Sequence, residues 1–171
     1  YDRQTESWWQ QLIGEGIVGD MTGRTLKTLP ADIVSYAQFK AAFPDGKILS
    51  RDTGHVRQYG RNPYRGYDSI ADRPFLFFDD VDPRLAPMER ILNVKVGDKQ
   101  KIFPFSALDK EPVINDDFNG QSLVIFSRPG VHSALDAGEI AEGREVRAVT
   151  AYRRSLEGRT LTFSVHGDGF R

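Results

Sequence analysis

The chain has 171 residues and a mass of 19.3 kDa, a length that suits one domain able to bury about 70% of its unfolded surface. Hydrophobic residues make up 39% and charged residues 27%, which excludes disorder, collagen-like repeats and a coiled coil. A net charge of −1 gives no overall field that attracts nucleic acid. No apolar run approaches the ~18 residues of a membrane-crossing helix. Zero cysteines exclude disulfides, thiolate zinc sites and a cysteine nucleophile. We therefore predict neither nucleic-acid partners nor membrane insertion.

The start of the sequence does not indicate a compartment. The chain begins at Tyr1, without an initiator methionine and without a basic-then-apolar segment. We expect either a processed N-terminus or a piece of a longer protein. The lack of cysteine fits an extracytoplasmic compartment only weakly.

Strands and one helix are predicted for the first half of the chain. Apolar residues between Trp8 and Val18 come in pairs interrupted by glycines, which disfavour a helix, so two short strands joined by a bend are expected there. Ser35 and Gln38 have the spacing of a capping box and predict a helix over about residues 35–43. Its aromatic residues recur at helical spacing and predict one buried stripe, made of Tyr36, Phe39 and Phe43.

The middle of the chain is predicted to contain a long ordered loop and one strand. Glycines and Pro63 recur between residues 51 and 68 and disfavour both helix and strand there. The dense apolar run Phe75–Phe78, between Pro74 and Asp79, predicts a strand buried on both faces.

Three hairpins are predicted for the second half. Each consists of two apolar runs separated by a two-residue turn signal, of which Asn119-Gly120 is the strongest. The fold class is therefore α+β and β-rich: antiparallel hairpins forming a curled sheet or barrel with one short helix, in a single domain over residues 1–171. The predicted strand pairs are Ile91–Val96 with Lys99–Phe105, Val113–Phe118 with Gln121–Phe126, and Val146–Arg154 with Arg159–Val165.

Residues 51–67, here called the arginine–tyrosine loop, are the leading candidate site. The loop holds three of the six tyrosines and one of the three histidines. Guanidinium groups fit carboxylate or phosphate, and tyrosine rings offer stacking surfaces with a hydroxyl at the edge. The alternative is a structural loop whose arginines pair with the aspartates at positions 68, 72, 79, 80 and 82. The predicted ligand contacts are Arg57, Tyr59, Arg61, Tyr64 and Tyr67.

Catalysis and metal binding have weaker support. His55 as a base oriented by Asp52 is the catalytic candidate, and the sequence lacks the Gly-x-Ser-x-Gly elbow and the His-Glu-x-x-His motif. The acidic run at residues 79–82 lacks EF-hand spacing, and nothing in the spacing of His166 and Asp168 requires a site with His55. We predict no metal, no cofactor and, on balance, no enzyme.

Several short segments along the chain form a recognisable set. They are Tyr1–Thr5 with Ser7 and Trp8, Gly14-Glu15 with Gly19, Gly23 with Leu29-Pro30, Phe43–Asp45, Leu49–Gly54, Tyr59–Tyr64 with Gly66-Tyr67, Phe103–Phe105, Asn115-Asp116 and Gly158–Phe163. With these segments the chain resembles, over nearly its whole length, a bacterial and archaeal family, the domain of unknown function 3179. The arginine–tyrosine loop is the most specific part of the resemblance.

This resemblance implies an exported protein and supplies no activity. It also implies two similar units in longer relatives, so that residues 1–88 correspond to the end of a first repeat-like unit and residues 89–171 to the hairpin module of a second. The Cys-Pro-x-Cys-Gly segment of such relatives is missing here, which places any thiol- or metal-dependent role in doubt. A chain clipped in this way would expose sheet edges, so we expect an oligomer or a subunit of a complex.

The sequence therefore predicts an exported, non-catalytic binding module that recognises a small anionic or carbohydrate-like ligand, or a partner protein, through the arginine–tyrosine loop. A hydrolase-like enzyme using His55 and Asp52 is one alternative. A structural subunit of an envelope assembly is the other.

Overall fold

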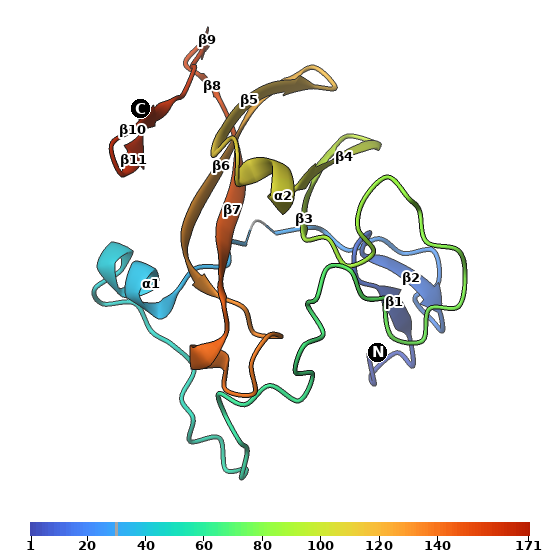
Figure 1. Ribbon diagram of the computed structural model, residues 1–171. Helices are drawn as coiled ribbons and strands as arrows, with labels where there is room; N and C mark the ends of the chain where they lie inside the picture. The colour runs from blue at the N-terminus through green and yellow to red at the C-terminus, as the bar shows by residue number, and fades with distance from the viewer. Residues whose placement is uncertain (30) are drawn as a thin grey trace. The chain divides into compact units, whose positions relative to one another are not determined.

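The computed structural model describes residues 1–29 and 31–171. Contacts divide the chain into two compact units, Tyr1–Ala31 and Asp32–Arg171 (Figure 1). The expected organisation into repeat-like parts at residues 1–88 and 89–171 stays a prediction. None of the described helices has the length and apolarity needed to cross a bilayer.

The first unit is a small hairpin. Strands β1 (Trp8–Gln10) and β2 (Glu15–Val18) pair antiparallel, which confirms the two short strands predicted there. A turn at Asp2–Ser7 precedes them and is closed by an isolated β-bridge between its two ends.

Side chains of this turn explain an Asp-x-x-Thr-x-Ser pattern near the N-terminus. The Thr5 hydroxyl donates to Asp2 Oδ2 at 2.6 Å. The fully buried Ser7 hydroxyl donates to the Thr5 carbonyl at 2.8 Å and accepts from the Met21 amide at 3.0 Å. The hydrogen bond from Thr5 is the main reason that the pKa of Asp2 is lowered. The pattern therefore has a structural role, because its side chains form hydrogen bonds that hold the first unit together.

Helix α1 (Tyr36–Ala42) opens the second unit and confirms the predicted helix. The capping box is present: the Gln38 amide donates to Ser35 Oγ, and the Ser35 amide donates to Gln38 Oε1. The predicted buried aromatic stripe is wrong, because Tyr36 is 62% and Phe43 60% exposed. The helix has only two turns and buries none of its residues. Phe39 and Phe43 contact each other, with ring centroids 5.6 Å apart.

Antiparallel hairpins form the body of the second unit. The strands β3 (Ile91–Val96) and β4 (Lys99–Pro104) pair around Gly97-Asp98. A three-stranded sheet in the order β5-β6-β7 contains β5 (Val113–Phe118), β6 (Gln121–His132) and β7 (Glu145–Arg153). The fold class is thereby confirmed as β-rich with antiparallel hairpins, in open sheets rather than a closed barrel.

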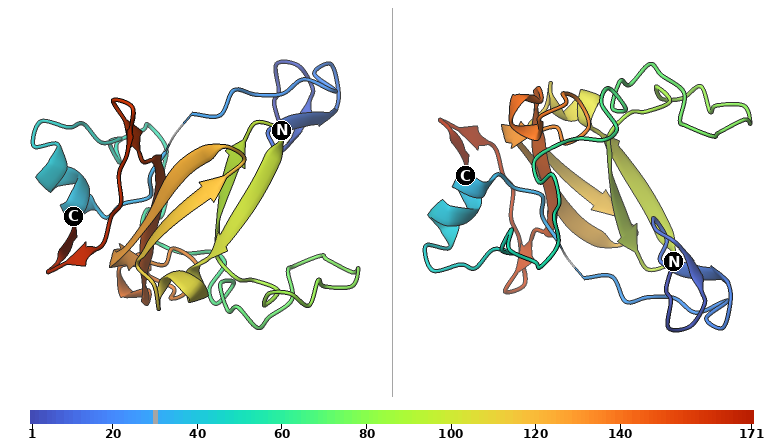
Figure 2. Two further views of the ribbon diagram at one scale, coloured as in Figure 1. Left: turned by 90° about the horizontal axis from the view of Figure 1, so that it is seen from above. Right: turned by 90° about the horizontal axis from the view of Figure 1, so that it is seen from below.

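The hydrophobic core lies between the β3–β4 hairpin and the three-stranded sheet, which run alongside each other in both views of Figure 2. A four-residue helix that the sequence did not predict, α2 (Phe105–Leu108), adds the fully buried Leu108. Burying a side chain such as Leu108 or Ile125 contributes roughly 1.5–3 kcal/mol. The buried core residues are Phe103, Leu108, Leu123 and Ile125.

The third predicted hairpin forms only at its tip. Residues 145–153 pair with β6 instead, because this twelve-residue strand extends well past β5 and offers a second edge. Only the two-residue strands β8 (Ser155–Leu156) and β9 (Arg159–Thr160) close around Glu157-Gly158. The remaining elements are η1 (Ile140–Glu142), β10 (Val165–His166) and β11 (Gly169–Phe170).

The predicted buried strand at residues 75–78 is also wrong. The segment is a turn in which Phe75 is 75% and Phe78 86% exposed. Leu76 has a φ of +60°, which interrupts an extended backbone. No strand pairs with this segment in the described chain, so its backbone lacks the ladder that a buried strand requires.

Candidate functional site

The second half of the arginine–tyrosine loop is fixed by backbone pairing. Arg61 and Glu139 form an isolated antiparallel bridge. On either side of it, the Ile140 amide donates to the Gly60 carbonyl and the Asn62 amide donates to the Gly138 carbonyl, both at 2.8 Å. The loop thus contacts residues 138–140 through one isolated bridge, and residues 51–68 contain no strand or helix, in agreement with the predicted ordered loop.

Asn62 fixes the loop through hydrogen bonds of its side chain. Its side chain is buried, with 8% exposure. The amide nitrogen Nδ2 donates to the Ala137 carbonyl at 3.0 Å, and Oδ1 accepts from the Tyr64 amide at 2.8 Å. A further bond runs from the Gly66 amide to the Asp136 carbonyl. Residues 60–66 therefore have a defined backbone before any ligand arrives.

Asp68, just beyond the loop, is the centre of a buried ionic network. Its side chain is 5% exposed and accepts from Arg90 Nη2 at 2.8 Å and from Ser133 Oγ. Arg144 Nη2 lies 3.1 Å from the same carboxylate. Ser133 directly follows β6, Arg144 directly precedes β7 and Arg90 directly precedes β3, so these partners tie the end of the loop to the ends of three strands.

The network controls the ionisation of Asp68. Burial, the largest single influence, acts to raise the pKa of its carboxyl group. Hydrogen bonds from Ser133 and Arg90, with the positive charges of Arg90 and Arg144, outweigh burial and hold the pKa below its ordinary value. Asp68 therefore stays a carboxylate and neutralises part of the arginine charge around it.

One hollow of about 920 Å³ lies along the anchored part of the loop. Three arginines and two glutamates line it, so the hollow carries excess positive charge. The lining residues are Arg57, Gln58, Tyr59, Arg61, Asn62, Pro63, Arg65, Ala137, Gly138, Glu139 and Glu142.

The arginines of this hollow keep most of their donors available. Arg61 Nε lies 3.2 Å from Glu139 Oε1, with both side chains largely exposed. Among the residues that the structure describes, the Arg57 side chain donates only to the adjacent Val56 carbonyl. Arg65 forms no hydrogen bond or ion pair within residues 1–29 and 31–171. Tyr59 shares a hydrogen bond of 2.9 Å with Thr53 Oγ1, which holds its phenol at the rim.

A second hollow of about 740 Å³ begins on the other side of Arg65. The rings of Tyr64 and Tyr67 lie 6.2 Å apart in a tilted arrangement, and the Phe75 amide donates to the Tyr67 hydroxyl. The structure therefore distributes the five predicted contacts over two adjoining hollows, Arg57, Tyr59 and Arg61 in one and Tyr64 and Tyr67 in the other. Arg65, which the sequence did not single out, lines both.

The downstream aspartates do not pair with the loop arginines in the described chain. Asp68 pairs with Arg90 and Arg144. Asp82 pairs with Arg84 at 2.5 Å, and this hydrogen-bonded partner lowers the pKa of Asp82 to about 2. The ion pairs expected for the structural alternative are therefore wrong in their partners. Of the loop arginines, only Arg61 forms an ion pair within the described residues, and its partner is Glu139.

His55 and Asp52 lie in the first half of the loop, and both are exposed. The Asp52 amide donates to Ser50 Oγ at 3.0 Å. No hydrogen bond joins the His55 ring to the Asp52 carboxylate in the part of the chain that the structure describes, and their catalytic role stays a prediction. Across the same residues, no group of three or more histidine, aspartate or glutamate side chains is arranged to hold a metal ion.

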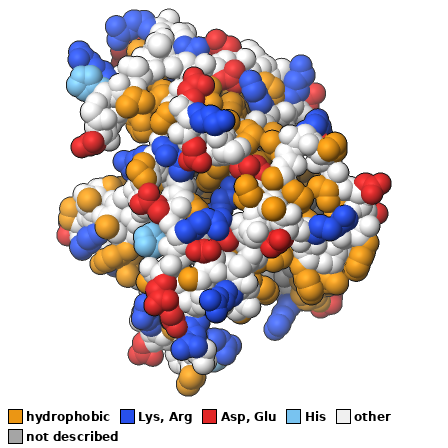
Figure 3. Space-filling view, viewed as in Figure 1, with side chains coloured by type: hydrophobic (Ala, Val, Ile, Leu, Met, Phe, Trp, Pro, Cys, Tyr) orange, Lys and Arg blue, Asp and Glu red, His pale blue; other side chains and the backbone are white. Residues whose placement is uncertain are grey.

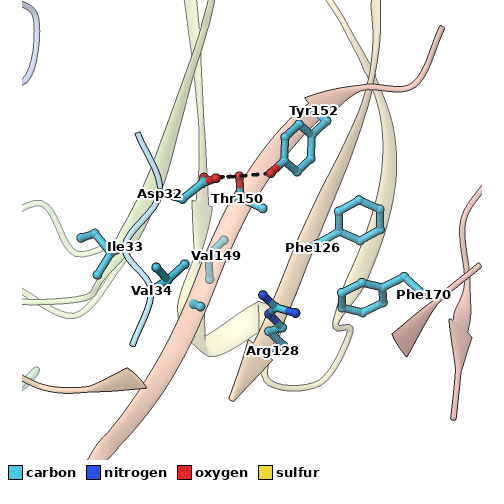
Figure 4. Close-up of a pocket in the computed structure, with 10 residues that line it drawn as sticks. Asp32, Ile33, Val34, Phe126, Arg128, Val149, Thr150, Tyr152 and Phe170 are labelled. Carbon is cyan, nitrogen blue, oxygen red and sulfur yellow. Dashed lines mark hydrogen bonds between the residues drawn. The ribbon is translucent and has the colours of Figure 1, made fainter. Parts of the chain in front are cut away.

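Sequence reasoning missed a third hollow, of about 210 Å³, on the sheet of the second unit (Figure 4). Asp32 accepts hydrogen bonds there from the hydroxyls of Thr150, at 2.6 Å, and Tyr152, at 3.3 Å. Phe126 and Phe170 stack beside them with ring centroids 4.6 Å apart. The alternation of side chains between the two faces of β6 and β7 could have predicted which of their residues line this hollow. It could not place residues 32–34 and 170, which are distant from these strands in sequence.

A family model described as a protein of unknown function, DUF3179, matches residues 1–169. The match covers both compact units and includes the whole arginine–tyrosine loop. No curated protein and no solved structure has significant similarity to the chain.

Proposed function

Since the chain belongs to the DUF3179 family of proteins of unknown function, we propose from its geometry that it is a non-catalytic binding module for a small anionic ligand. The ligand carries a carboxylate or phosphate group and binds in the hollow lined by Arg57, Arg61 and Arg65. The observation that carries the proposal is that more arginines than glutamates line the hollow, along a loop segment whose backbone is already held by hydrogen bonds.

Charge supports an anionic ligand. The hollow presents three guanidinium groups against the carboxylates of Glu139 and Glu142. A guanidinium can donate two parallel hydrogen bonds to one carboxylate or phosphate, and such charge-assisted bonds are about twice as strong as neutral ones. Arg57 and Arg65 have these donors free of other side chains in the described chain, so a ligand need not break an existing ion pair to reach them.

Preorganisation also supports binding. The backbone bonds at Gly60, Asn62 and Gly66 fix the segment that carries Arg61 and Arg65. A fixed segment loses little conformational entropy when a ligand binds. The export implied by the family resemblance would place this binding outside the cytoplasm, which is part of the same proposal.

Calorimetric titration with citrate and with inorganic phosphate tests the function. We expect saturable binding of at least one anion, weakened about tenfold or more by Arg65→Gln, because one charge-assisted hydrogen bond contributes about 1.5–3 kcal/mol. Arg159→Gln is the matched control, since Arg159 is an exposed arginine of β9 outside the hollow. Equal affinity in the Arg65→Gln variant and its control would overturn the proposal.

A second candidate, a structural subunit, is favoured by exposed apolar residues. Phe75, Leu76 and Phe78 project from the turn at residues 75–78, and apolar side chains reach the surface at several places on the face drawn in Figure 3. Clustered exposed apolar residues are typical of contact surfaces.

Light scattering on dilution tests this candidate, with a Phe75→Ser/Phe78→Ser double variant beside the natural chain. A dimer or larger assembly that the double variant dissociates supports the candidate. A monomer at all concentrations contradicts it.

A further inference from the structure

The two faces of the sheet formed by β6 and β7 have different surroundings. Alternate residues of a strand point to opposite faces. Leu123 and Ile125 of β6 belong to the core, with Val149 and Ala151 of β7 packed against them. The other face carries Phe126 and Arg128, which pair in register with Thr150 and Ala148. Val124 on this face is also buried, and the part of the face beyond it forms the hollow of Figure 4.

The polar end of the hollow is formed by Asp32. Its two carboxylate oxygens each accept one hydroxyl hydrogen, from Thr150 and from Tyr152. A carboxylate has about four acceptor positions, so acceptor capacity remains after these two bonds. Both hydroxyls are already directed at Asp32, which leaves the carboxylate as the acceptor that a ligand would meet at this end.

The side of the hollow is aromatic. The rings of Phe126 and Phe170 are stacked with an interplanar angle of 20°, and Tyr152 lies 6.2 Å from Phe126. Figure 4 shows these rings on one side of the hollow and Val34 on the other. Aromatic rings prefer offset-stacked or edge-to-face neighbours, so a flat ring suits the space between these walls.

Arg128 supplies positive charge at the opposite end from Asp32, as Figure 4 shows. It is exposed, and its guanidinium group forms no hydrogen bond or ion pair within the described ranges. The hollow therefore offers free guanidinium donors, an aromatic wall and a carboxylate acceptor in succession. Its volume of about 210 Å³ is below the ~300 Å³ at which pockets for drug-sized ligands begin, so the occupant is small.

We propose that this hollow binds a small single-ring aromatic carboxylate that carries a hydroxyl at the opposite end of the ring. The carboxylate pairs with Arg128, the ring packs beside Phe126 and Phe170, and the hydroxyl donates to Asp32. The site is separate from the arginine–tyrosine loop and does not depend on the function proposed for that loop.

Three probes separate the parts of this proposal: 4-hydroxyphenylacetate, phenylacetate, which lacks the hydroxyl, and 4-methylphenol, which lacks the carboxylate. Affinities of the full chain are measured by calorimetry, and the site is located from NMR shifts of the amides at residues 126–128 and 148–152. We expect 4-hydroxyphenylacetate to bind most tightly and to shift these amides. A failure to shift them, or equal affinity of all three probes, would overturn the proposal.

Two variants assign the contacts. Arg128→Gln should weaken both carboxylate probes about tenfold and leave 4-methylphenol unchanged. Asp32→Asn should reduce the advantage of 4-hydroxyphenylacetate over phenylacetate about fivefold, an effect that a loosened wall would not produce because it would weaken both probes alike. Arg153→Gln, an exposed arginine of β7 outside the hollow, is the control. Unchanged carboxylate affinity in Arg128→Gln, or an equal loss for both carboxylates in Asp32→Asn, would contradict the assignment.

Discussion

Arg144 Nη2 lies 3.1 Å from the carboxylate of Asp68, a residue 76 positions earlier in the chain. This ion pair joins the start of β7 to the end of the arginine–tyrosine loop. Arg90 completes the junction from the residue preceding β3. The candidate anion site is therefore supported by a carboxylate that does not line it.

Replacing the central carboxylate should destabilise the second unit. Asp68→Asn removes the charge that Arg90 and Arg144 share and should lower the free energy of unfolding by about 2–3 kcal/mol, less than for a fully buried pair because both arginines are partly exposed. Urea unfolding followed by circular dichroism measures the change. Asp72→Asn, at an exposed aspartate of the same stretch, should leave the midpoint nearly unchanged, and an equal loss in both variants would argue against the network.

Acid should weaken the same junction. The pKa of Asp68 is lower in the folded than in the unfolded chain, so the folded state binds this proton less readily. The stability it contributes is complete above the unfolded value of about 4 and is lost as the pH falls through the lowered folded value. Unfolding measured at pH 7 and at pH 3 should show a smaller pH dependence in Asp68→Asn than in the natural chain. Identical pH dependence in the two chains would contradict this assignment.

Removing the anchor of the loop should loosen the candidate site without unfolding the core. Asn62→Ala deletes two hydrogen bonds of a buried side chain and should cost about 1–3 kcal/mol. Hydrogen exchange should accelerate at the Tyr64 and Gly66 amides and stay slow at Ile125. Gln58→Ala, at an exposed neighbour, is the control, and unchanged exchange at Tyr64 in Asn62→Ala would show that the loop is held by other contacts.

The turn between β5 and β6 gives a prediction that concerns only the scaffold. Asn119 has a φ of +47°, and its side chain donates to the Val96 carbonyl at 2.9 Å, which links two hairpins. Asn119→Ala should destabilise the chain by about 1–2 kcal/mol. Asn119→Gly restores only the backbone freedom, so it should recover part of the loss in thermal unfolding. Full recovery would mean that the bond to Val96 contributes nothing.

Local signals in the sequence predicted most of the strands and the helix. The capping box at Ser35 and the turns at Gly97-Asp98 and Asn119-Gly120 act over two to four residues, so their outcome depends little on the rest of the chain. The run at residues 75–78 was predicted wrongly because a buried strand needs partner strands, and apolar composition alone does not supply them.

The candidate site was less predictable because its contacts are long-range. The loop could be recognised from its arginines and tyrosines, but Asp68 finds Ser133 and Arg144 far along the chain. Asp32 meets Thr150 after a separation of 118 residues. Charge and residue type indicate that such groups need partners, whereas the choice among several arginines follows only from the fold.

The pairing of β6 on both edges sets how the chain tolerates insertions and deletions. Adding or deleting one residue within Leu123–Arg128 would exchange the two faces of the strand. The side chain of Ile125 would then be exposed to water, and the side chains of Phe126 and Arg128 would point into the core. The number of residues between the start of β6 and Ser133 would also change by one. Length variation among natural or engineered versions should therefore be confined to the exposed first half of the arginine–tyrosine loop and the tips of the hairpins, while β6 keeps a constant length.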